Sequence, residues 1–447
     1  MSSPERSKLS LPIALLVGIL TAAVYALYSW YQWHRLEMWS WDLGIFSQLA
    51  KAYSTFSAPI VNIKGHGFNL LGDHFHPILV VTGPLWKLWP SPVMLLILQA
   101  VLFGLSAIPL TRLAVDKLSV PVGTALGLAY GLSWGLQSAV MSQFHEIAFA
   151  VPIIAFGLTA YLRGRLLASA LWMGALVFVK EDLGVTVALF GLIILVRHWK
   201  EPGARKTGSL LALWGIAWVF LATRAILPAL NPADQYDYAD KLGSLADLFT
   251  PADKWHTVGL LILAAGVIGL RSPLTVLMLP TLAWRFAGEV ERYWVWRWHY
   301  NATLMPIAIA ALVEAAILWP KLRTWAVAAT VASTAILTTQ LPLLKLFDED
   351  WREPSPRWEA AQRAIESIPE GSSVASDNPL LVYYVPRAEV YWVDGSAPEP
   401  DFVSLNEEGN WPNWSNGRTP AGYAEQQHGG AYETHFHEEG FIIVRRR

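Results

Sequence analysis

Cysteine is absent from this chain of 447 residues, and charged residues make up only 15% of it. The lack of cysteine excludes a disulfide-stapled secreted fold, a thiolate metal centre, a cysteine enzyme and a lipid-anchored lipoprotein. A net charge of −2 excludes a basic surface for nucleic acid. Since a soluble domain carries roughly 25% charged residues and here 54% are hydrophobic, the composition predicts a protein whose solvent is a lipid bilayer.

Apolar runs separated by charged residues continue to about residue 345. We place predicted spans at 9–31, 92–111, 119–137, 147–162, 166–179, 184–196, 208–228, 257–270, 273–287, 301–318 and 324–341. Several runs, among them 166–179 and 184–196, are shorter than the roughly 20 residues of an upright crossing of a full bilayer. The predicted fold class is an α-helical polytopic membrane protein with about eleven transmembrane helices in residues 1–345.

Lysine and arginine predict the orientation, because they concentrate in cytoplasmic loops. With the N-terminus in the cytoplasm, the inner side receives Arg6, Lys8, Arg112, Lys117, Arg163, Arg165, Arg197, Lys200, Arg205, Lys206, Arg271, Lys321 and Arg323. The first run is too long for a signal-peptide core and is interpreted as an uncleaved anchor. We therefore expect a multi-pass cell-membrane protein with an extracytoplasmic C-terminus.

Two outer regions lie outside the predicted spans. The first outer loop, 32–91, has amphipathic pieces at Leu43–Tyr53 and Ile78–Trp89 that suit the membrane interface. Residues 346–447 are polar, and their alternating runs predict an extracytoplasmic α/β domain. Its expected parts are strands at Ser373–Ser376, Glu389–Val393, Asp401–Leu405 and Gly440–Val444, a helix over Arg357–Ile368 and a long loop over Asn406–Gly430.

On this topology the unusual polar and ionisable residues gather on the outer side. Charges at membrane depth are costly unless paired or hydrated, so we predict an outward-facing polar cavity there. Its candidate residues are Asp42, Gln48, Asp73, His74, His76, His145, Glu146, Lys180, Glu181, Asp182, His299 and Tyr300.

The candidate catalytic carboxylates are Asp42, Asp73, Glu181 and Asp182. Asp42 opens an amphipathic helix, where it is either a helix N-cap or a general base for an acceptor hydroxyl. For the acids beside Lys180, the alternatives are an ion pair that ties two helix ends together and acid or metal-ligand chemistry.

The sequence Asp73-His74-Phe75-His76 puts two imidazoles on one side of an extended segment. Two histidines and a carboxylate are able to bind a divalent metal, but histidines in loops more often only form hydrogen bonds. Metal binding by His74 and His76 is the less favoured alternative, and no other cofactor is indicated.

Arginines near the outer interface are candidates for binding a phosphate. Arg224 and Arg285 lie inside apolar runs, and Arg297 lies among Trp and Tyr residues. Guanidinium groups bind phosphate bidentately and stack on aromatic rings, which suits a polyprenyl-phosphate headgroup. Ordinary snorkelling at the interface explains part of this pattern.

Five ordered motifs resemble a family of predicted membrane proteins of unknown function. They are Asp42-Leu-Gly-Ile-Phe-Ser-Gln48, Gly72-Asp-His-Phe-His-Pro-Ile78, Gln143-Phe-His-Glu-Ile147, Lys180-Glu-Asp-Leu183 and His299-Tyr-Asn-Ala-Thr-Leu-Met-Pro306. That family is similar in layout to polytopic glycosyltransferases of the GT-C type. The resemblance implies a lipid-phosphate-linked sugar donor and places Asp42 at the position of the catalytic acid residue. The first outer loop lacks the adjacent pair of acids typical of those enzymes.

The first interpretation is therefore an inverting glycosyltransferase that moves a sugar from a polyprenyl-phosphate carrier to a glycan or other acceptor of the cell envelope. The alternatives are a transporter or flippase of lipid-linked glycans and a non-catalytic envelope scaffold. Transporters place ionisable groups near the midplane and need gates on both faces. The one-sided distribution of these residues favours an enzyme acting on the outer face.

Overall fold

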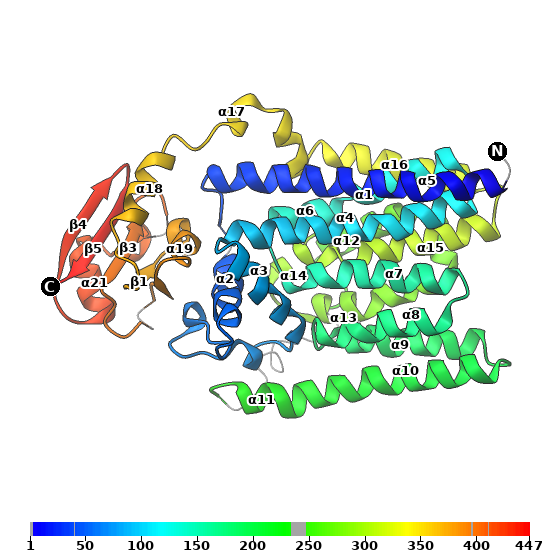
Figure 1. Cartoon of the computed structure of the whole chain (residues 1–447), viewed down its shortest axis with the longest axis horizontal. Coiled ribbons are helices and arrows are strands. Elements are labelled where there is room, and N and C mark those ends of the chain that lie inside the picture. Colours follow the sequence, from blue (N-terminus) through cyan, green and yellow to red (C-terminus); the bar gives the residue numbers. More distant parts are fainter. Residues whose placement is uncertain (1–2, 40, 234–246, 395–396, 410) are drawn as a thin grey trace.

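The computed structural model describes residues 3–39, 41–233, 247–394, 397–409 and 411–447. Long helices lie side by side in a bundle, and a small sheet with its own helices lies beyond one end of them (Figure 1). The helix α2 (Trp41–Ser54) lies between the bundle and the sheet.

The bundle and its connections consist of helices of very different length. The α-helices are α1 Ser3–His34, α3 Thr82–Leu88, α4 Pro92–Lys117, α5 Val120–Gly131, α6 Trp134–Met141, α7 Ala150–Leu162, α8 Leu166–Gly174, α9 Leu183–Arg197, α10 Pro202–Leu221, α11 Leu227–Leu230, α12 Asp253–Ala264, α13 Leu279–Ala287, α14 Glu291–Trp294, α15 Leu304–Leu318, α16 Arg323–Thr338 and α17 Glu349–Arg352. Short 3₁₀ segments join them: η1 Asn62–Lys64, η2 Leu70–Gly72, η3 Pro77–Val81, η4 Glu146–Phe149, η5 Ala175–Phe178, η8 Ile268–Arg271, η9 Pro273–Met278, η10 His299–Asn301 and η11 Pro342–Phe347. The π-helical turn η6 (Ala222–Ile226) lies between α10 and α11.

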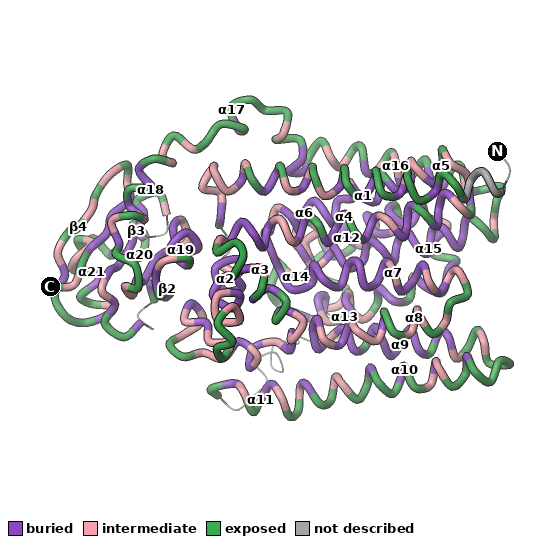
Figure 2. Tube along the Cα trace, viewed as in Figure 1, coloured by how far each residue is buried: buried purple, intermediate pink, exposed green. Residues whose placement is uncertain are grey.

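Burial distinguishes the centre of the bundle from its edge. Every residue of α15 from Leu304 to Ala316 is buried, as expected for a helix that is apolar on all sides and surrounded by others. The helix α10 lies at the periphery, and most of its length is exposed or half-buried (Figure 2). Its apolar exposed residues, among them Leu213 and Phe220, suit contact with lipid.

Local signals in the sequence explain where α4 begins and how closely it packs on α1. The Ser91 hydroxyl accepts a hydrogen bond from the Val93 amide, and Pro92 occupies the first turn. A side chain at Gly104 would come within 2.5 Å of the Gly18 carbonyl oxygen. Small residues therefore let the two helix backbones touch, as is common between helices in membranes.

Helices lie at each of the eleven predicted spans, but few are long enough to cross a bilayer. Among the residues that the structure describes, three helices are long and apolar enough to span a membrane, at Lys8–His34, Pro92–Lys117 and Pro202–Leu230. A fourth is added if the pair Glu291–Asn301 and Leu304–Leu318, bent by 66°, counts as one span. The predicted span 119–137 is interrupted between α5 and α6. The count of eleven stays a prediction.

The C-terminal part contains a five-stranded mixed sheet. Its strands are β1 Ser373–Ser376, β2 Glu389–Trp392, β3 Phe402–Asn406, β4 Tyr432–Glu438 and β5 Phe441–Arg446, and its helices are α18 Trp358–Glu366, α19 Asn378–Tyr384, α20 Trp411–Trp414 and α21 Pro420–His428. The strand order is β2-β1-β3-β5-β4. Strand β1 pairs in parallel with β2 and β3, and β5 pairs antiparallel with β3 and β4. We call residues 358–447 the sheet unit.

The four predicted strands and the predicted helix are confirmed within one or two residues. The long loop expected over Asn406–Gly430 is wrong, because α20 and α21 occupy much of it. Strand β4 was not predicted. Its sequence Tyr-Glu-Thr-His-Phe-His-Glu has only two apolar residues, and most of its residues are half-buried or exposed.

Hydrophobic contacts differ on the two faces of the sheet. One face carries a separate cluster that includes Val403, Leu405, Tyr423 and Val444. On the other face, residues such as Val390 and Ile443 belong to the same continuous cluster as the core of the bundle. The sheet unit therefore has one core of its own and shares another with the helices.

Helix α2 joins these two parts. Its residues from Leu43 to Ala50 are all buried in the protein, and its position at the membrane interface stays a prediction. The Gln48 amide donates to the Val390 carbonyl of β2 at 2.7 Å and accepts from the Ile63 amide at 3.1 Å. The Lys51 ammonium donates to the Val385 carbonyl at 2.7 Å. The predicted piece Ile78–Trp89 is helical as η3 and α3.

Candidate functional site

A polar cavity of about 250 Å³ lies at the end of the bundle beside α2. Nine of the predicted cavity residues line it: Asp42, Asp73, His74, His76, His145, Glu146, Lys180, His299 and Tyr300. They come from the first outer loop, the turns before η4 and α9, and η10. The structure thus brings together residues that are up to 258 positions apart in the sequence, from Asp42 to Tyr300.

Asp42 lies in the first turn of α2, on the wall of the cavity nearest the sheet unit. Its carboxylate oxygen Oδ2 lies 3.5 Å from Nε2 of His145, at ion-pair distance but longer than a good hydrogen bond. Ser47 and Gln48, which follow Asp42 in the same helix, are both buried. Gln48 does not line the cavity, because its amide is used to hold β2 and Ile63.

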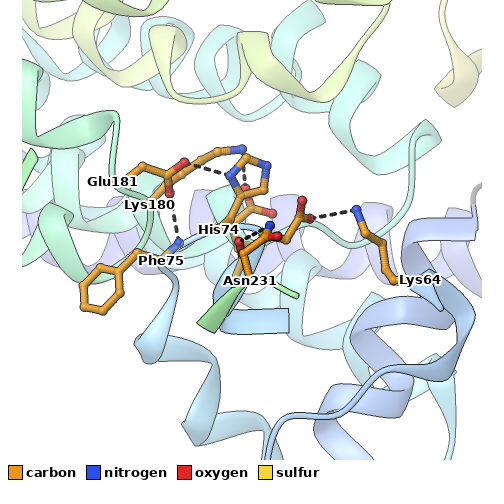
Figure 3. A network of polar contacts seen from close by, with 9 residues as sticks. Lys64, His74, Phe75, Lys180, Glu181 and Asn231 are labelled. Carbon is orange, nitrogen blue, oxygen red and sulfur yellow. Dashed lines mark hydrogen bonds and ion pairs between the residues drawn. The ribbon is translucent and has the colours of Figure 1, made fainter. Parts of the chain in front are cut away.

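Glu181 lies behind the opposite wall and fixes the segment that carries the histidines. One oxygen lies 2.8 Å from Nδ1 of His74, and the other accepts the backbone amide of Phe75 at 3.0 Å (Figure 3). Burial alone would raise the pKa of Glu181, but the charge and hydrogen bond of His74 lower it below its ordinary value. Glu181 is therefore an ionised positioning group for the outer loop.

Two lysines pair with the remaining acids of this wall. The Lys180 ammonium lies 2.9 Å from Glu146, and the Lys64 ammonium lies 3.0 Å from Asp73. Burial disfavours the charge on Asp73, but His74 and Lys64 beside it lower its pKa. The predicted ion pair of Lys180 exists, with Glu146 rather than with one of the two acids next to it.

Exposure ranks the three acids that line the cavity. The side chain of Glu146 is 4% exposed and that of Asp73 is 12% exposed, whereas that of Asp42 is 35% exposed. A group that takes a proton from a substrate must be within hydrogen-bond reach of it. Asp42 is the acid whose carboxylate is open to a molecule in the cavity.

Two histidines form the floor beside Asp42. The rings of His145 and His299 stack with centroids 3.5 Å apart. Gln143, two residues before His145, has a left-handed backbone with φ of 69°, a strained conformation for a residue other than glycine. Its side chain donates to the Glu37 carbonyl at 3.2 Å, and His145 Nδ1 contacts the Gln143 carbonyl at 3.2 Å. The turn thus sets the position of the His145 ring facing Asp42.

His74 and His76 both line the cavity. Burial lowers the pKa of His76 to about 4, which keeps that ring neutral. Burial and Lys180 would lower the pKa of His74, but Glu181 and Asp73 raise it. Among the described residues, no group of three or more His, Asp and Glu side chains is arranged to hold a metal ion.

Asp182 lies apart from the main cavity, in a very small one lined also by Thr281, Trp284 and Tyr300. Burial raises its pKa to about 6. Its oxygen Oδ1 is enclosed and has no hydrogen-bond partner in the structure. Asp182 therefore does not share the main cavity with Asp42 and Asp73.

None of the three predicted phosphate-binding arginines lines the cavity. Arg224 and Arg297 are exposed. Arg285 is fully buried, and it donates through Nε to the Tyr293 carbonyl and through Nη1 to Asn301 Oδ1 at 3.0 Å. Arg285 holds the turn that carries His299 and Tyr300, and does not reach the space that a ligand would fill.

The other polar residues that line the cavity were not predicted from the sequence to belong to it. They are Lys64, Arg292, Tyr293 and Trp298. Arg292 lies over the ring of Trp298 at 5.7 Å and forms no ion pair with a carboxylate in the described part of the chain. The position of Arg292 among the Trp and Tyr residues of Glu291–Tyr300 was the signal in the sequence that could have identified it as a cavity residue.

Comparison with known proteins supports the architecture. The structure aligns with ArnT from Cupriavidus metallidurans bound to undecaprenyl phosphate at a TM-score of 0.59 and 10% identity, covering 98% of this chain and 97% of ArnT. The apo state of the same protein aligns at a TM-score of 0.53 and 10% identity, over 95% and 97% of the two chains. No curated protein matches the sequence.

The chain thus shares the fold of ArnT, and it has an acid-bearing cavity at the end of its helical bundle. The model of the family described as predicted membrane protein (DUF2079) matches residues 32–443. The chain belongs to this family, which confirms the resemblance seen in its motifs.

Proposed function

We propose that this protein is an integral-membrane glycosyltransferase that moves a sugar from a polyprenyl-phosphate carrier to an acceptor of the cell envelope. The observation that carries the proposal is the position of Asp42, an accessible carboxylate in a cavity whose other lining acids are paired with lysines. The likeness in fold to ArnT, which has been crystallised with undecaprenyl phosphate, supports the choice of donor class.

In the proposed reaction, the Asp42 carboxylate takes the proton of an acceptor hydroxyl as that oxygen attacks the anomeric carbon. The bond between the anomeric carbon and the phosphate oxygen breaks, and the phosphate leaves with the electron pair. The new glycosidic bond therefore has inverted configuration. Arg292 is the cation proposed to bind the leaving phosphate, in place of the arginines favoured from the sequence.

His145 is proposed as a positioning residue in this mechanism. Its Nε2 lies at ion-pair distance from Asp42, and its ring is held by the stack on His299. This arrangement orients the carboxylate, and the Asp42 side chain stays 35% exposed toward an acceptor.

The test is transfer of radiolabelled sugar from polyprenyl-phosphate donors into membrane or wall fractions. We expect Asp42→Asn to fold and insert normally and to lower the transfer rate about 10²- to 10⁴-fold, because the amide does not accept the proton. Glu353→Gln, which changes an exposed acid outside the cavity, is the matched control.

Two results would contradict the proposal in different ways. Wild-type transfer by the Asp42→Asn variant at matched expression would remove Asp42 as the base. If the wild type transfers sugar from no donor but moves a labelled lipid-linked glycan across proteoliposomes, the protein is a transporter.

The proposed orientation places the cavity, the sheet unit and the C-terminus outside the cytoplasm. The absence of native cysteine makes this directly measurable, since one introduced thiol is the only one in the chain. In intact cells, a membrane-impermeant maleimide should label Asn413→Cys but not Lys200→Cys. The reverse pattern would show that the predicted topology is inverted.

A further inference from the structure

Five tryptophans form two groups of ring contacts beside the cavity. The ring of Trp41 lies 5.6 Å from that of Trp392, and Trp392 lies 6.0 Å from Trp414. On the other side, Trp39 lies 5.3 Å from Trp298. We call these residues the tryptophan cluster.

The cluster is continuous with the proposed catalytic site. Trp41 precedes Asp42 in the chain, and both Trp41 and Trp298 line the cavity. Trp392 is the last residue of β2, and Trp414 ends α20. A molecule lying on the cluster would therefore extend from the sheet unit to the Asp42 carboxylate.

The topology of the sheet marks the same place. In open α/β sheets, ligands bind outside the carboxyl ends of the strands where the strand order reverses. Strand β1 lies between β2 and β3, all three parallel, so this point is at the carboxyl end of β1. Asn378 follows that end, and its amide donates to the Trp39 carbonyl at 3.2 Å.

The rings remain accessible although they pack on one another. Trp39 is 41% exposed and Trp414 is 36% exposed, while Trp41, Trp298 and Trp392 are half-buried. The exposed parts lie beside polar groups of Asp42, Arg292 and Asn378. Flat aromatic surfaces that alternate with hydrogen-bonding groups match a sugar ring, which presents C–H groups on its faces and hydroxyls at its edge.

We propose that the tryptophan cluster binds the saccharide part of the acceptor and delivers its hydroxyl to Asp42, so that the acceptor is a glycan. This inference rests on the proposed function for the identity of the acceptor, but binding needs neither donor nor transfer. A lipid chain is the other occupant that tryptophans at a membrane protein often contact. The elements that carry Trp392 and Trp414, β2 and α20, lie beyond the ends of the long helices, which favours the saccharide (Figure 2).

The test is saturation-transfer NMR on the full-length Asp42→Asn protein in nanodiscs, with maltotetraose, cellotetraose and chitotetraose as probes. We expect at least one probe to receive saturation through its ring C–H protons. Trp392→Ala and Trp414→Ala should each weaken its binding about tenfold, and Trp392→Phe should restore much of it. Trp325→Ala, which changes an exposed tryptophan of α16, is the matched control and should bind as before.

Three outcomes would overturn the inference: no probe binds at millimolar concentration, binding survives both alanine substitutions, or a spin label on Asn413→Cys meets dissolved oxygen more readily than a water-soluble nickel complex. The last result would place the cluster in lipid. Because these measurements use a variant without the proposed base, their outcome is independent of whether the wild type transfers sugar.

Discussion

Ion pairs in the cavity wall and ion pairs on the sheet unit both join a basic residue to a glutamate, but in different surroundings. Lys180 and Glu146 come from two turns of the bundle, and their side chains are 11% and 4% exposed. Arg445 and Glu433 lie on neighbouring strands, and theirs are 51% and 39% exposed. In the first pair, each buried charge needs its partner, because an unpaired charge inside the protein is strongly destabilising. The second pair adds little stability, because water already solvates both of its charges.

The largest effect should follow from breaking the buried pair. Lys180→Met leaves the Glu146 carboxylate uncompensated, so we expect the free energy of unfolding to fall by about 3–5 kcal/mol. Unfolding by SDS in mixed micelles measures the change. The double variant Glu146→Gln, Lys180→Met removes both charges and should recover most of the loss. If the single variant is as stable as the wild type, the pair is not buried in the folded protein.

The pair of His74 and Glu181 should make the stability of the same wall depend on pH. The pKa of His74 is raised from 6.5, so its stabilising effect is complete below that value and is lost as the pH rises through the raised pKa. The pKa of Glu181 is lowered from 4.5, so its effect is present above that value and is lost as the pH falls through the lowered pKa.

His74→Asn keeps a donor for Glu181 but does not titrate. Between pH 4.5 and pH 6.5, we expect the free energy of unfolding of the wild type to exceed that of the variant by about 2 kcal/mol. This difference should shrink at alkaline pH. Thermal unfolding of both proteins across a pH series measures it. A difference that does not change with pH would show that His74 is not charged in the folded protein.

A smaller effect is expected on donor binding, where Arg292 lines the cavity and Arg297 does not. We expect Arg292→Ala to raise the KM for the donor about tenfold, equivalent to about 1.4 kcal/mol, with a smaller effect on kcat. Arg297→Ala should leave both parameters within about twofold, because this residue lies on the ring of Trp296 outside the cavity. Equal losses in the two variants would contradict the assignment of Arg292 to the phosphate.

The smallest effect is expected on the sheet unit. Arg445→Ala breaks an exposed pair, so the free energy of unfolding should fall by no more than about 1 kcal/mol. The same SDS titration compares it directly with Lys180→Met. A loss as large as that of the buried pair would mean that exposure does not decide the strength of these contacts.

Much of the fold was predictable because it follows from patterns along one segment. Apolar runs place the helices, and alternation at Ser373–Ser376 and Glu389–Val393 places two of the strands. The pattern fails where an element buries little: β4 at the sheet edge and the polar helix α21 bear no apolar period. The length of an apolar run also does not decide which helices span the membrane. The helix α7 has 13 residues and is about 20 Å long, so it needs neighbouring segments to complete a crossing.

The site was predictable in its residues but not in its pairings. The concentration of polar residues on one side identified nine residues of the cavity. The partner of Lys180 is 34 residues away, and only helix packing brings Glu146 to it. Likewise, an apolar run does not reveal in which direction a side chain points from the helix. Arg285 and Arg224 were therefore equally good candidates for binding phosphate, although Arg285 is buried and Arg224 is exposed.

The hydrogen bonds from Gln48 and Lys51 to the segment Val385–Val390 have a consequence for biosynthesis. Helix α2 leaves the ribosome early, but the backbone that anchors it is synthesised more than 300 residues later. During translation the bundle helices are inserted while the Asp42 wall still lacks its support. The support of the Asp42 wall is therefore missing from the nascent chain until the sheet unit has folded, close to the end of assembly.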